Sequence, residues 1–463
     1  MLYKSTRGSS SEVPFSEVLL GGLAPDGGLY MPDYFPSMTL EEINDMDGLQ
    51  YHELASKILF PFVEGEISQL DFSNLVEETY RVFDIGNVVN LVELEKEKWV
   101  LELFHGPTLA FKDIAMQLLG ALLDYFSKKQ GKRIAVLGAT SGDTGAAAIS
   151  ACSRYSNVDV FILYPHGRIT EVQRRQMTTS QAKNVHALAV ETDFDGCQAM
   201  VKDMFLDASM VQESTRLIAA NSINWTRCMT QSVYFFWSYL KLKDITSSLS
   251  FSIPSGNFGH AYAGWTAKQI GLPIDRLLVA TNSNDVLYKL FSNNLYEKGN
   301  VNQTLAPSMD ISVASNFERL LYNLYNDNSD LLLDAMNTFK NKSIQIPHER
   351  WPEIKEIFPS LSSNDEQIIH QIKETFSNHN YLLDPHTATG IRAAKNLALK
   401  DETIVTMATA HPAKFVDAMK SALEEYPIDE PPQLKLTNER EEVFTVLPNN
   451  LNVVKDYVRT NLK

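Results

Sequence analysis

Short apolar runs alternate with helical patterns along most of the chain after residue 98. The apolar runs lie at 99–104, 133–138, 158–164, 185–190, 216–219, 249–253, 277–281 and 404–409. The clearest helical patterns lie between them, at 114–129, 144–154, 171–180 and 226–241. Most of the runs show no polar alternation, which is typical of strands buried on both faces of a parallel sheet. The pattern therefore predicts an α/β protein whose parallel sheets are covered by helices on both faces.

Changes in this pattern predict the organisation of the chain. Residues 1–95 carry a glycine-dense stretch at 21–30 and then two helical patterns, which favours a small N-terminal α/β domain. Residues 96–235 and 236–463 each predict one doubly wound lobe. Between about 290 and 376 the alternation of strands and helices stops, and the sequence is Asn-rich and acidic with helical patterns. We therefore expect a helical insertion outside the second lobe. A terminal strand and helix are expected near the end of the chain.

Charge and cysteine content narrow the possible partners. The net charge of −16 over 463 residues argues against nucleic acid, because phosphate backbones select basic patches. Three cysteines lie far apart without metal-ligand or disulfide spacing, which is typical of a reducing cytoplasm. The N-terminal residues carry no apolar signal segment, and no run reaches the ~18 apolar residues that a membrane span needs. We expect a cytoplasmic protein with no metal and no membrane partner, whose oligomeric state, monomer or homodimer, the sequence leaves open.

A lysine stands where a loop enters an apolar helix. In LELFHGPTLAFKDIAMQLLG, at 101–120, the Gly-Pro break is followed by Lys112 and then by the helical pattern. An isolated lysine at such a position is usually solvated, since lysine is rarely buried. The alternative is a partly desolvated amine with a lowered pKa, ready to form a Schiff base. Lys112 alone leaves both interpretations open.

Two predicted strands run directly into loops of small residues that begin helices. These loops are GATSGDTG at 138–145 and PSGNFG at 254–259. Exposed backbone N–H groups and the helix dipole at such positions suit a carboxylate or a phosphate. Neither loop is a nucleotide P-loop, and each could be an ordinary strand–turn–helix connection, with Asp143 near the N-cap of the first helix. Together they favour a ligand with one anionic group in each loop.

A third predicted strand ends in polar residues, where α/β folds place ligands. Thr409 at its end offers a hydroxyl group either to a heterocycle nitrogen or to the nearby backbone. Lys414, five residues further on, is a candidate contact for an anion.

Four motifs, in chain order, resemble those of threonine synthases: HGPTLAFKD at 105–113, GATSGDTG at 138–145, PSGNFG at 254–259 and TAHPAKF at 409–415. STRG at 5–8 and GLAPDGGLYMP at 22–32 are similar to the N-terminal domain of that family. The resemblance covers nearly the whole chain. Threonine synthases are pyridoxal-phosphate enzymes with the fold of the tryptophan synthase β chain, so the resemblance implies two doubly wound lobes with the cofactor between them.

The resemblance also implies roles for individual residues. Lys112 falls on the lysine that forms the Schiff base with the cofactor, and Thr409 on the residue that faces the pyridine nitrogen. The loop for the cofactor phosphate is Gly256, Asn257, Phe258 and Gly259, followed by His260 where many relatives have aspartate. The loop for the substrate carboxylate contributes Thr140, Ser141, Asp143 and Thr144. Candidate cations for the substrate phosphate are Arg168, Arg227 and Lys414, each of which could instead form a surface ion pair.

The reaction implied by the resemblance converts O-phospho-L-homoserine and water to L-threonine and phosphate, the last step of threonine biosynthesis, as a carbon–oxygen lyase. Lys112 would act as the acid and base at the substrate carbons. Two alternatives stay open. A related phospho-lyase would release 2-oxobutyrate and ammonia, and a non-catalytic protein would only hold pyridoxal phosphate or another anion. The intact Lys112 argues against the second alternative.

Overall fold

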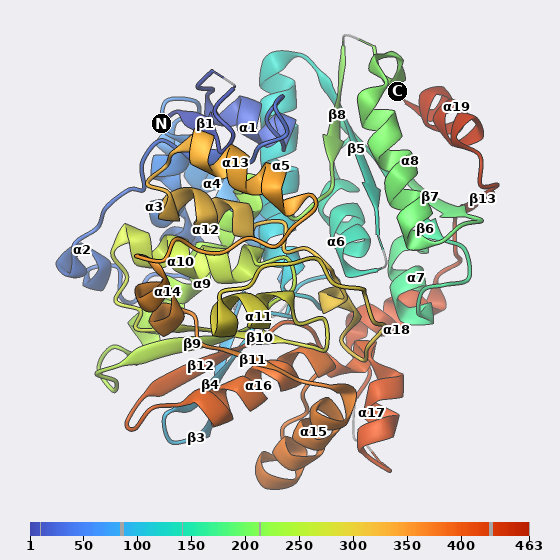
Figure 1. Ribbon diagram of the computed structural model, residues 1–463. Helices are drawn as coiled ribbons and strands as arrows, with labels where there is room; N and C mark the ends of the chain where they lie inside the picture. The colour runs from blue at the N-terminus through green and yellow to red at the C-terminus, as the bar shows by residue number, and fades with distance from the viewer. Residues whose placement is uncertain (10, 84–87, 141, 213, 426–428, 463) are drawn as a thin grey trace.

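A computed structural model describes residues 1–9, 11–83, 88–140, 142–212, 214–425 and 429–462. Two large sheets carry the fold, one low in the view of Figure 1 and the other at its upper right. The first sheet has the order β11-β10-β9-β12-β4-β3, and every pair is parallel except the β3–β4 hairpin. Its strands are β3 (Asn90–Glu95), β4 (Lys98–Glu102), β9 (Leu249–Pro254), β10 (Leu277–Thr281), β11 (Ser360–Ser362) and β12 (Thr403–Ala408).

The second sheet is parallel throughout, with the order β13-β7-β6-β5-β8. Its strands are β5 (Arg133–Ala139), β6 (Val158–Pro165), β7 (Val185–Val190), β8 (Thr215–Ala219) and β13 (Thr445–Leu447). The central strand β6 is buried at every position, as its continuous apolar run predicts.

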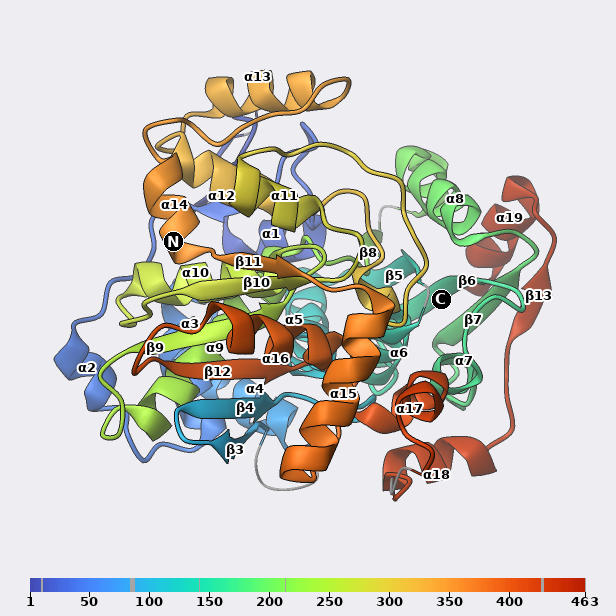
Figure 2. The same ribbon diagram turned by 60° about the horizontal axis from the view of Figure 1, so that its bottom comes forward.

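Helices cover both faces of each sheet. In the first sheet α16 (Pro385–Leu397) packs on β9, β10 and β12, and α15 (Asp365–His379) packs outside it, as Figure 2 shows. The other face meets α9 (Trp225–Leu242) and α10 (Gly259–Ile270). The second sheet lies between α5 (Lys112–Gln130) with α6 (Asp143–Cys152) and α8 (Phe194–Leu206) with α19 (Leu451–Asn461). The predicted doubly wound α/β architecture is confirmed.

The N-terminal region is a small α/β unit packed against α5 and α9. Its two strands, β1 (Tyr3–Ser5) and β2 (Tyr30–Pro32), pair antiparallel. The helices are α1 (Phe15–Gly21), α2 (Leu40–Asn44), α3 (Tyr51–Val63) and α4 (Gln69–Tyr80). Aromatic side chains, among them Phe62 against Trp225, join this unit to the rest of the core.

The stretch that was expected to be a helical insertion is largely helical but is not confined to the outside. Its helices are α11 (Val286–Asn293), η2 (Pro307–Met309), α12 (Phe317–Leu324), α13 (Ser329–Phe339) and α14 (Trp351–Ile357). The short strand β11 extends the first sheet, and Ser308 reaches the carboxylate of Asp143 in the other lobe. The Asn and Asp residues of this stretch indicate its loops, but they do not predict the contact between Ser308 and Asp143.

The remaining helices lie between strands of the second sheet or in the stretch between β12 and β13. They are α7 (Glu171–Thr178), η1 (Ala208–Met210), η3 (Pro412–Lys414), α17 (Val416–Ala422) and α18 (Pro432–Glu439). The expected terminal strand and helix are β13 and α19, and β13 joins the second sheet rather than the first. Likewise, β4 belongs to the first sheet, so each sheet combines distant stretches of chain. The limits proposed at residues 95 and 235 stay predictions.

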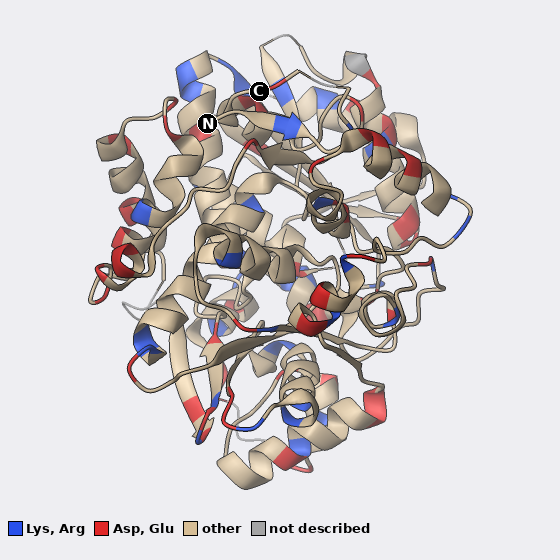
Figure 3. Ribbon diagram, turned by 60° about the vertical axis from the view of Figure 1, so that its left-hand side comes forward, with Lys and Arg blue, Asp and Glu red and all other residues tan. Residues whose placement is uncertain are grey.

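Figure 3 shows acidic and basic residues interspersed over the helices and loops of one side, with neither sign gathered on a single element. Among the described residues, each helix is too short or too polar to cross a bilayer.

Candidate active site

The predicted site residues follow the carboxyl ends of strands from both sheets. In the first sheet, β4 leads toward Lys112, β9 leads into 255–259, and β12 ends at Ala408, beside Thr409. In the second sheet, β5 leads to Asp143. Parallel strands present their carboxyl ends at one edge, which is where open α/β sheets bind ligands.

The loop before Lys112 is fixed to the chain that follows β12. The Phe111 amide donates to the Thr409 carbonyl oxygen at 2.8 Å, and the His411 amide donates to the Leu109 carbonyl oxygen at 3.1 Å. Since α5 begins at Lys112, these bonds place the first residue of the helix beside Thr409. Lys112 and Thr409 therefore lie side by side because the backbones of two segments, about 300 residues apart in sequence, are hydrogen-bonded to each other.

Lys112 is a desolvated amine rather than a solvated first-turn lysine. Its side chain is 11% exposed, and its Nζ lies 3.3 Å from Oδ2 of Asp143. Burial lowers the pKa of Lys112, and the charges of Lys414 and Arg227 lower it further, while Asp143 acts in the opposite direction. A lowered pKa makes the neutral amine, which Schiff-base formation and proton abstraction require, easier to reach.

Asp143 lies between two ammonium groups. Lys414 Nζ is 2.8 Å from Oδ1 of Asp143 and also donates to the Thr108 carbonyl oxygen at 2.7 Å, and its side chain is fully buried. Burial opposes ionisation of Asp143, but Lys414 and Lys112 outweigh it and hold its pKa well below the usual range. Asp143 does not cap its helix: the N-cap is Gly142, which has no side-chain cap.

The loop at 255–259 forms a cradle of backbone donors. Among the described residues, the N–H groups from Gly256 to His260 donate to no protein acceptor, and they lead into the first turn of the twelve-residue helix α10. The Asn257 carbonyl oxygen accepts from the Asn316 amide at 3.0 Å and from Asn316 Nδ2 at 3.1 Å, which holds the loop in place. Phe258 adopts φ 62° within this turn. Free N–H groups at a helix N-terminus suit a phosphate.

His260 brings this cradle to the lysine. Its ring stacks on Phe111 with centroids 4.9 Å apart, and Phe111 directly precedes Lys112. Neither ring nitrogen has a hydrogen-bond partner among the described residues, and burial lowers the pKa of His260 to about 3. His260 is therefore a neutral imidazole with both nitrogens available to a ligand.

The other predicted contacts differ in their placement. Thr140 Oγ1 accepts from the amides of Gly142 and Gly145 at 3.0 and 3.2 Å, so it shapes its own loop. Arg227 is buried, its Nε has no partner among the described residues, and burial lowers its pKa to about 10. Arg168 lies exposed in the turn after β6. Thr144 lies in the first turn of α6, and Ser141 lies outside the described residues.

Three residues that the sequence analysis did not select reach the same carboxylate or its neighbours. Ser308 Oγ lies 3.2 Å from Oδ2 of Asp143, and Gln173 Nε2 lies 3.4 Å from Oδ1. His386 Nε2 accepts from the Ser308 amide at 3.1 Å. Asp384-Pro385 is a helix-start signal that locates His386 in a first turn. No local signal marks Ser308.

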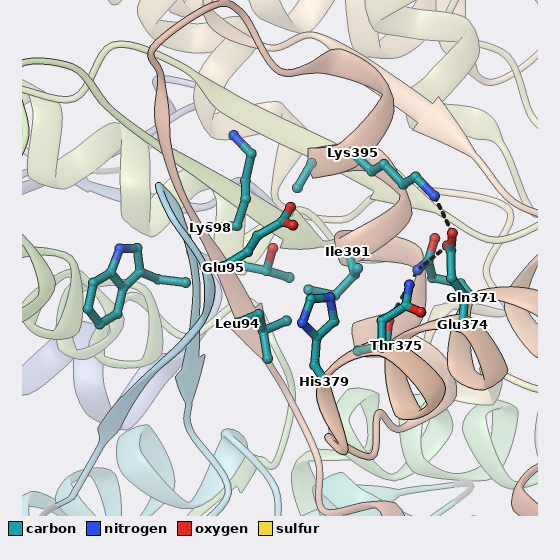
Figure 4. Close-up of a pocket in the computed structure, with 13 residues that line it drawn as sticks. Leu94, Glu95, Lys98, Gln371, Glu374, Thr375, His379, Ile391 and Lys395 are labelled. Atoms are coloured by element: carbon teal, nitrogen blue, oxygen red, sulfur yellow. Dashed lines mark hydrogen bonds and ion pairs between the residues drawn. The ribbon is translucent and has the colours of Figure 1, made fainter.

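A separate cavity of about 140 Å³ lies between the β3–β4 hairpin and the helices α15 and α16, and its lining residues are drawn in Figure 4. Lys98, His379 and Lys395 are among them, and Lys395 is paired with Glu374. None of the lining residues is a predicted site residue. This cavity is therefore distinct from the cluster around Lys112.

Models of three protein families match the chain in order. "Threonine synthase N terminus" matches residues 2–80, "Pyridoxal-phosphate dependent enzyme" matches 89–340, and "Threonine synthase, C-terminal" matches 387–458. Threonine synthase from Pseudomonas aeruginosa is 49% identical over 99% of this chain and 98% of its own length. The crystal structure of threonine synthase from Brucella melitensis with bound pyridoxal phosphate has a TM-score of 0.96 at 44% identity, covering 100% and 99% of the two chains. Yeast threonine synthase has a TM-score of 0.94 at 36% identity, covering 99% and 98%.

The fold and the site thus define a pyridoxal-phosphate-dependent enzyme of fold type II. Within that class, the chain belongs to the threonine synthase family, and the resemblance seen in its motifs is confirmed.

The site fits pyridoxal phosphate on its own geometry. Lys112 offers a desolvated amine to the aldehyde, and the unpaired N–H groups from Gly256 to His260 offer a cradle to the phosphate. Thr409, buried beside the Lys112 loop, has a hydroxyl group that could face the ring of a bound cofactor. These residues are the ones that would hold the cofactor.

Replacing Gly256 by alanine is expected to weaken cofactor binding. A Cβ atom there would lie 3.1 Å from the Met309 Cα and 3.3 Å from the Ser308 carbonyl oxygen, so backbone must move at the cradle. Overpacking of this kind costs about 1–3 kcal/mol, which corresponds to about a 5- to 150-fold weaker Kd. Titration of the apoenzyme with pyridoxal phosphate measures the effect. Gly299→Ala is the control, since its Cβ would meet nothing within 4 Å, and equal affinities in the two variants would contradict the prediction.

Proposed function

We propose that this chain converts O-phospho-L-homoserine and water to L-threonine and phosphate. The observation that carries the proposal is the desolvated Lys112 amine, paired with Asp143 and set beside a cradle of free backbone donors. Family membership supports the same reaction. The small-molecule substrate, rather than a macromolecule, agrees with a site built at strand ends inside the fold.

The reaction moves protons at neighbouring carbons while phosphate leaves and water adds. Bound pyridoxal phosphate supplies the electron sink for the carbanions. Lys112 removes the protons of Cα and Cβ and returns one to Cγ, since its lowered pKa keeps the neutral amine accessible. Asp143 stabilises the ammonium form of Lys112 between these transfers. The hydroxyl of water then bonds to Cβ, its proton goes to the departing phosphate, and Lys112 returns the second proton to Cα.

Substrate recognition follows from the remaining charges. The loop at 140–145 would receive the α-carboxylate at the N-terminus of α6. Arg227 is the cation best placed for the substrate phosphate, because it is buried near Lys112 with Nε unpaired among the described residues. Lys414 already has two partners, and Arg168 lies in an exposed turn. We further propose a cytoplasmic location, supported by three free, buried cysteines.

The test is to incubate the cofactor-loaded enzyme with O-phospho-L-homoserine and to quantify phosphate, threonine and 2-oxobutyrate together. We expect phosphate and threonine in equal amounts. Phosphate matched by 2-oxobutyrate would instead assign the phospho-lyase reaction. Cofactor-loaded protein that releases no phosphate would contradict both assignments.

A further inference from the structure

The segment 302–311 is fixed over the site by a network of side chains. Asn282 Nδ2, Asn284 Nδ2 and Thr304 Oγ1 all donate to Oδ1 of Asp310, at 2.7, 2.9 and 2.7 Å. The turn η2 that these bonds support places the Met309 backbone against Gly256 and the Ser308 hydroxyl group on Asp143. One short turn therefore contacts the cradle and the partner of Lys112 together.

His386 contacts this turn, and the partners of its two ring nitrogens define its tautomer. Its Nε2 lies 3.1 Å from the Ser308 amide, which can only donate, so Nε2 carries the lone pair. Its Nδ1 lies 2.8 Å from Oδ1 of Asp384 and therefore carries the proton. Asp384 also accepts from the amides of His386 and Thr387 as the N-cap of α16, which fixes the carboxylate. His386 is buried, so the hydrogen bonds on its two nitrogens select one neutral tautomer.

We propose that Ser308 is a positioning residue for the reaction, which orients Asp143 toward Lys112 and is itself placed by the His386–Asp384 pair. The Ser308 hydroxyl group donates to Oδ2, the oxygen that faces Lys112 Nζ. Lys414 and Gln173 occupy the opposite oxygen, Oδ1. Ser308 thus fixes the plane of the Asp143 carboxylate. Its hydrogen bond also draws off part of the negative charge on Oδ2, the oxygen that Lys112 contacts. The kinetic part of this proposal rests on the proposed function.

The first test uses the apoenzyme and needs no substrate. Selective ¹⁵N labelling of the 10 histidines, with the His386 signals assigned by their loss in His386→Gln, reports the tautomer. We expect a proton on Nδ1 and none on Nε2, and the opposite tautomer would overturn the proposal. The pH dependence of pyridoxal-phosphate capture then gives the pKa of free Lys112. In Ser308→Ala we expect this pKa to rise by about half a unit, because Asp143 no longer shares its charge with a donor; an unchanged pKa would overturn the proposal.

The second test is kinetic. Loss of a hydrogen bond to a charged group corresponds to about a ten- to a hundredfold change in rate. Ser308→Ala should therefore lower kcat by that factor and leave KM within about threefold. The control Ser292→Ala removes a half-buried hydroxyl group of α11 that is bonded to Ser360 of β11, and it should match the wild type. A kcat within about twofold of wild type for Ser308→Ala would overturn the proposal.

A double-mutant cycle tests whether His386 acts through Ser308. His386→Leu removes the acceptor and should lower kcat, whereas His386→Gln keeps an acceptor and should restore part of the loss. In Ser308→Ala/His386→Leu the further loss should stay below about threefold, since the two residues form one unit. Additive losses would overturn the link between them. If the wild type forms no threonine, the proposed reaction fails, and the tautomer and the Lys112 pKa still decide this proposal.

Discussion

Lys112→Ala is expected to lose threonine formation by at least about a thousandfold, because one group supplies both covalent attachment and proton transfer. The amine is desolvated and lies 3.3 Å from Asp143, and the described neighbours of this carboxylate offer no second amine except Lys414. Lys414 is held by Asp143 and by the Thr108 carbonyl oxygen, so it does not substitute for the missing group. The variant should also lose the long-wavelength absorbance of the lysine-bound cofactor.

The matched control is Lys128→Ala on the same helix. Lys128 is exposed and pairs with Asp124 one turn earlier, so its removal should leave both activity and absorbance unchanged. Activity is followed by threonine formation from O-phospho-L-homoserine after saturation with pyridoxal phosphate. Retention of more than a few per cent of the wild-type rate in Lys112→Ala would remove Lys112 from the role proposed here.

The sequence predicted those parts of the fold that depend on local pattern. The eight apolar runs became strands, and β6 is buried throughout because its run contains hardly any polar residue. The strands that the pattern missed all lie at sheet edges. β1, β2 and β11 have only three residues each, too few for a recognisable period, and the six-residue β3 has no fully buried position. The loops around Gly256 and Asp143 were found because a strand, a turn and a helix start are all local signals.

The contacts between these loops left no local signal. Asp143 directly follows the N-cap of α6, in the place that the sequence predicts, but only the tertiary fold brings its carboxylate to two lysines, one of them 271 residues further along the chain. Whether Lys112 is solvated or desolvated depends on what packs over it, so the sequence left both interpretations open. Ser308 lies in a stretch of polar loops, and only the tertiary structure brings its hydroxyl group to the site.

Lys414→Met is expected to be the most destabilising of the substitutions considered. The Lys414 side chain is fully buried and so is Asp143, and removing one partner of a buried pair costs about 3–5 kcal/mol because the other charge is left without compensation. Urea unfolding of the apoenzyme at neutral pH measures the loss. Lys395→Met is the control: its side chain is 58% exposed in the pair with Glu374, and exposed pairs contribute less than about 1 kcal/mol.

The pH dependence of this loss distinguishes a charge effect from a packing effect. In the wild type, Lys414 and Lys112 hold the pKa of Asp143 below its unfolded value, so the pair stabilises the fold above pH ~4 and the stabilisation is lost as pH falls through the folded pKa. In Lys414→Met the folded pKa is higher, and Asp143 becomes neutral at a higher pH. The difference between wild type and variant should therefore shrink as pH falls through the higher Asp143 pKa of the folded variant, because the unfolded pKa is the same in both. A difference that stays constant with pH would mean that Lys414 contributes through its buried stem rather than through its charge.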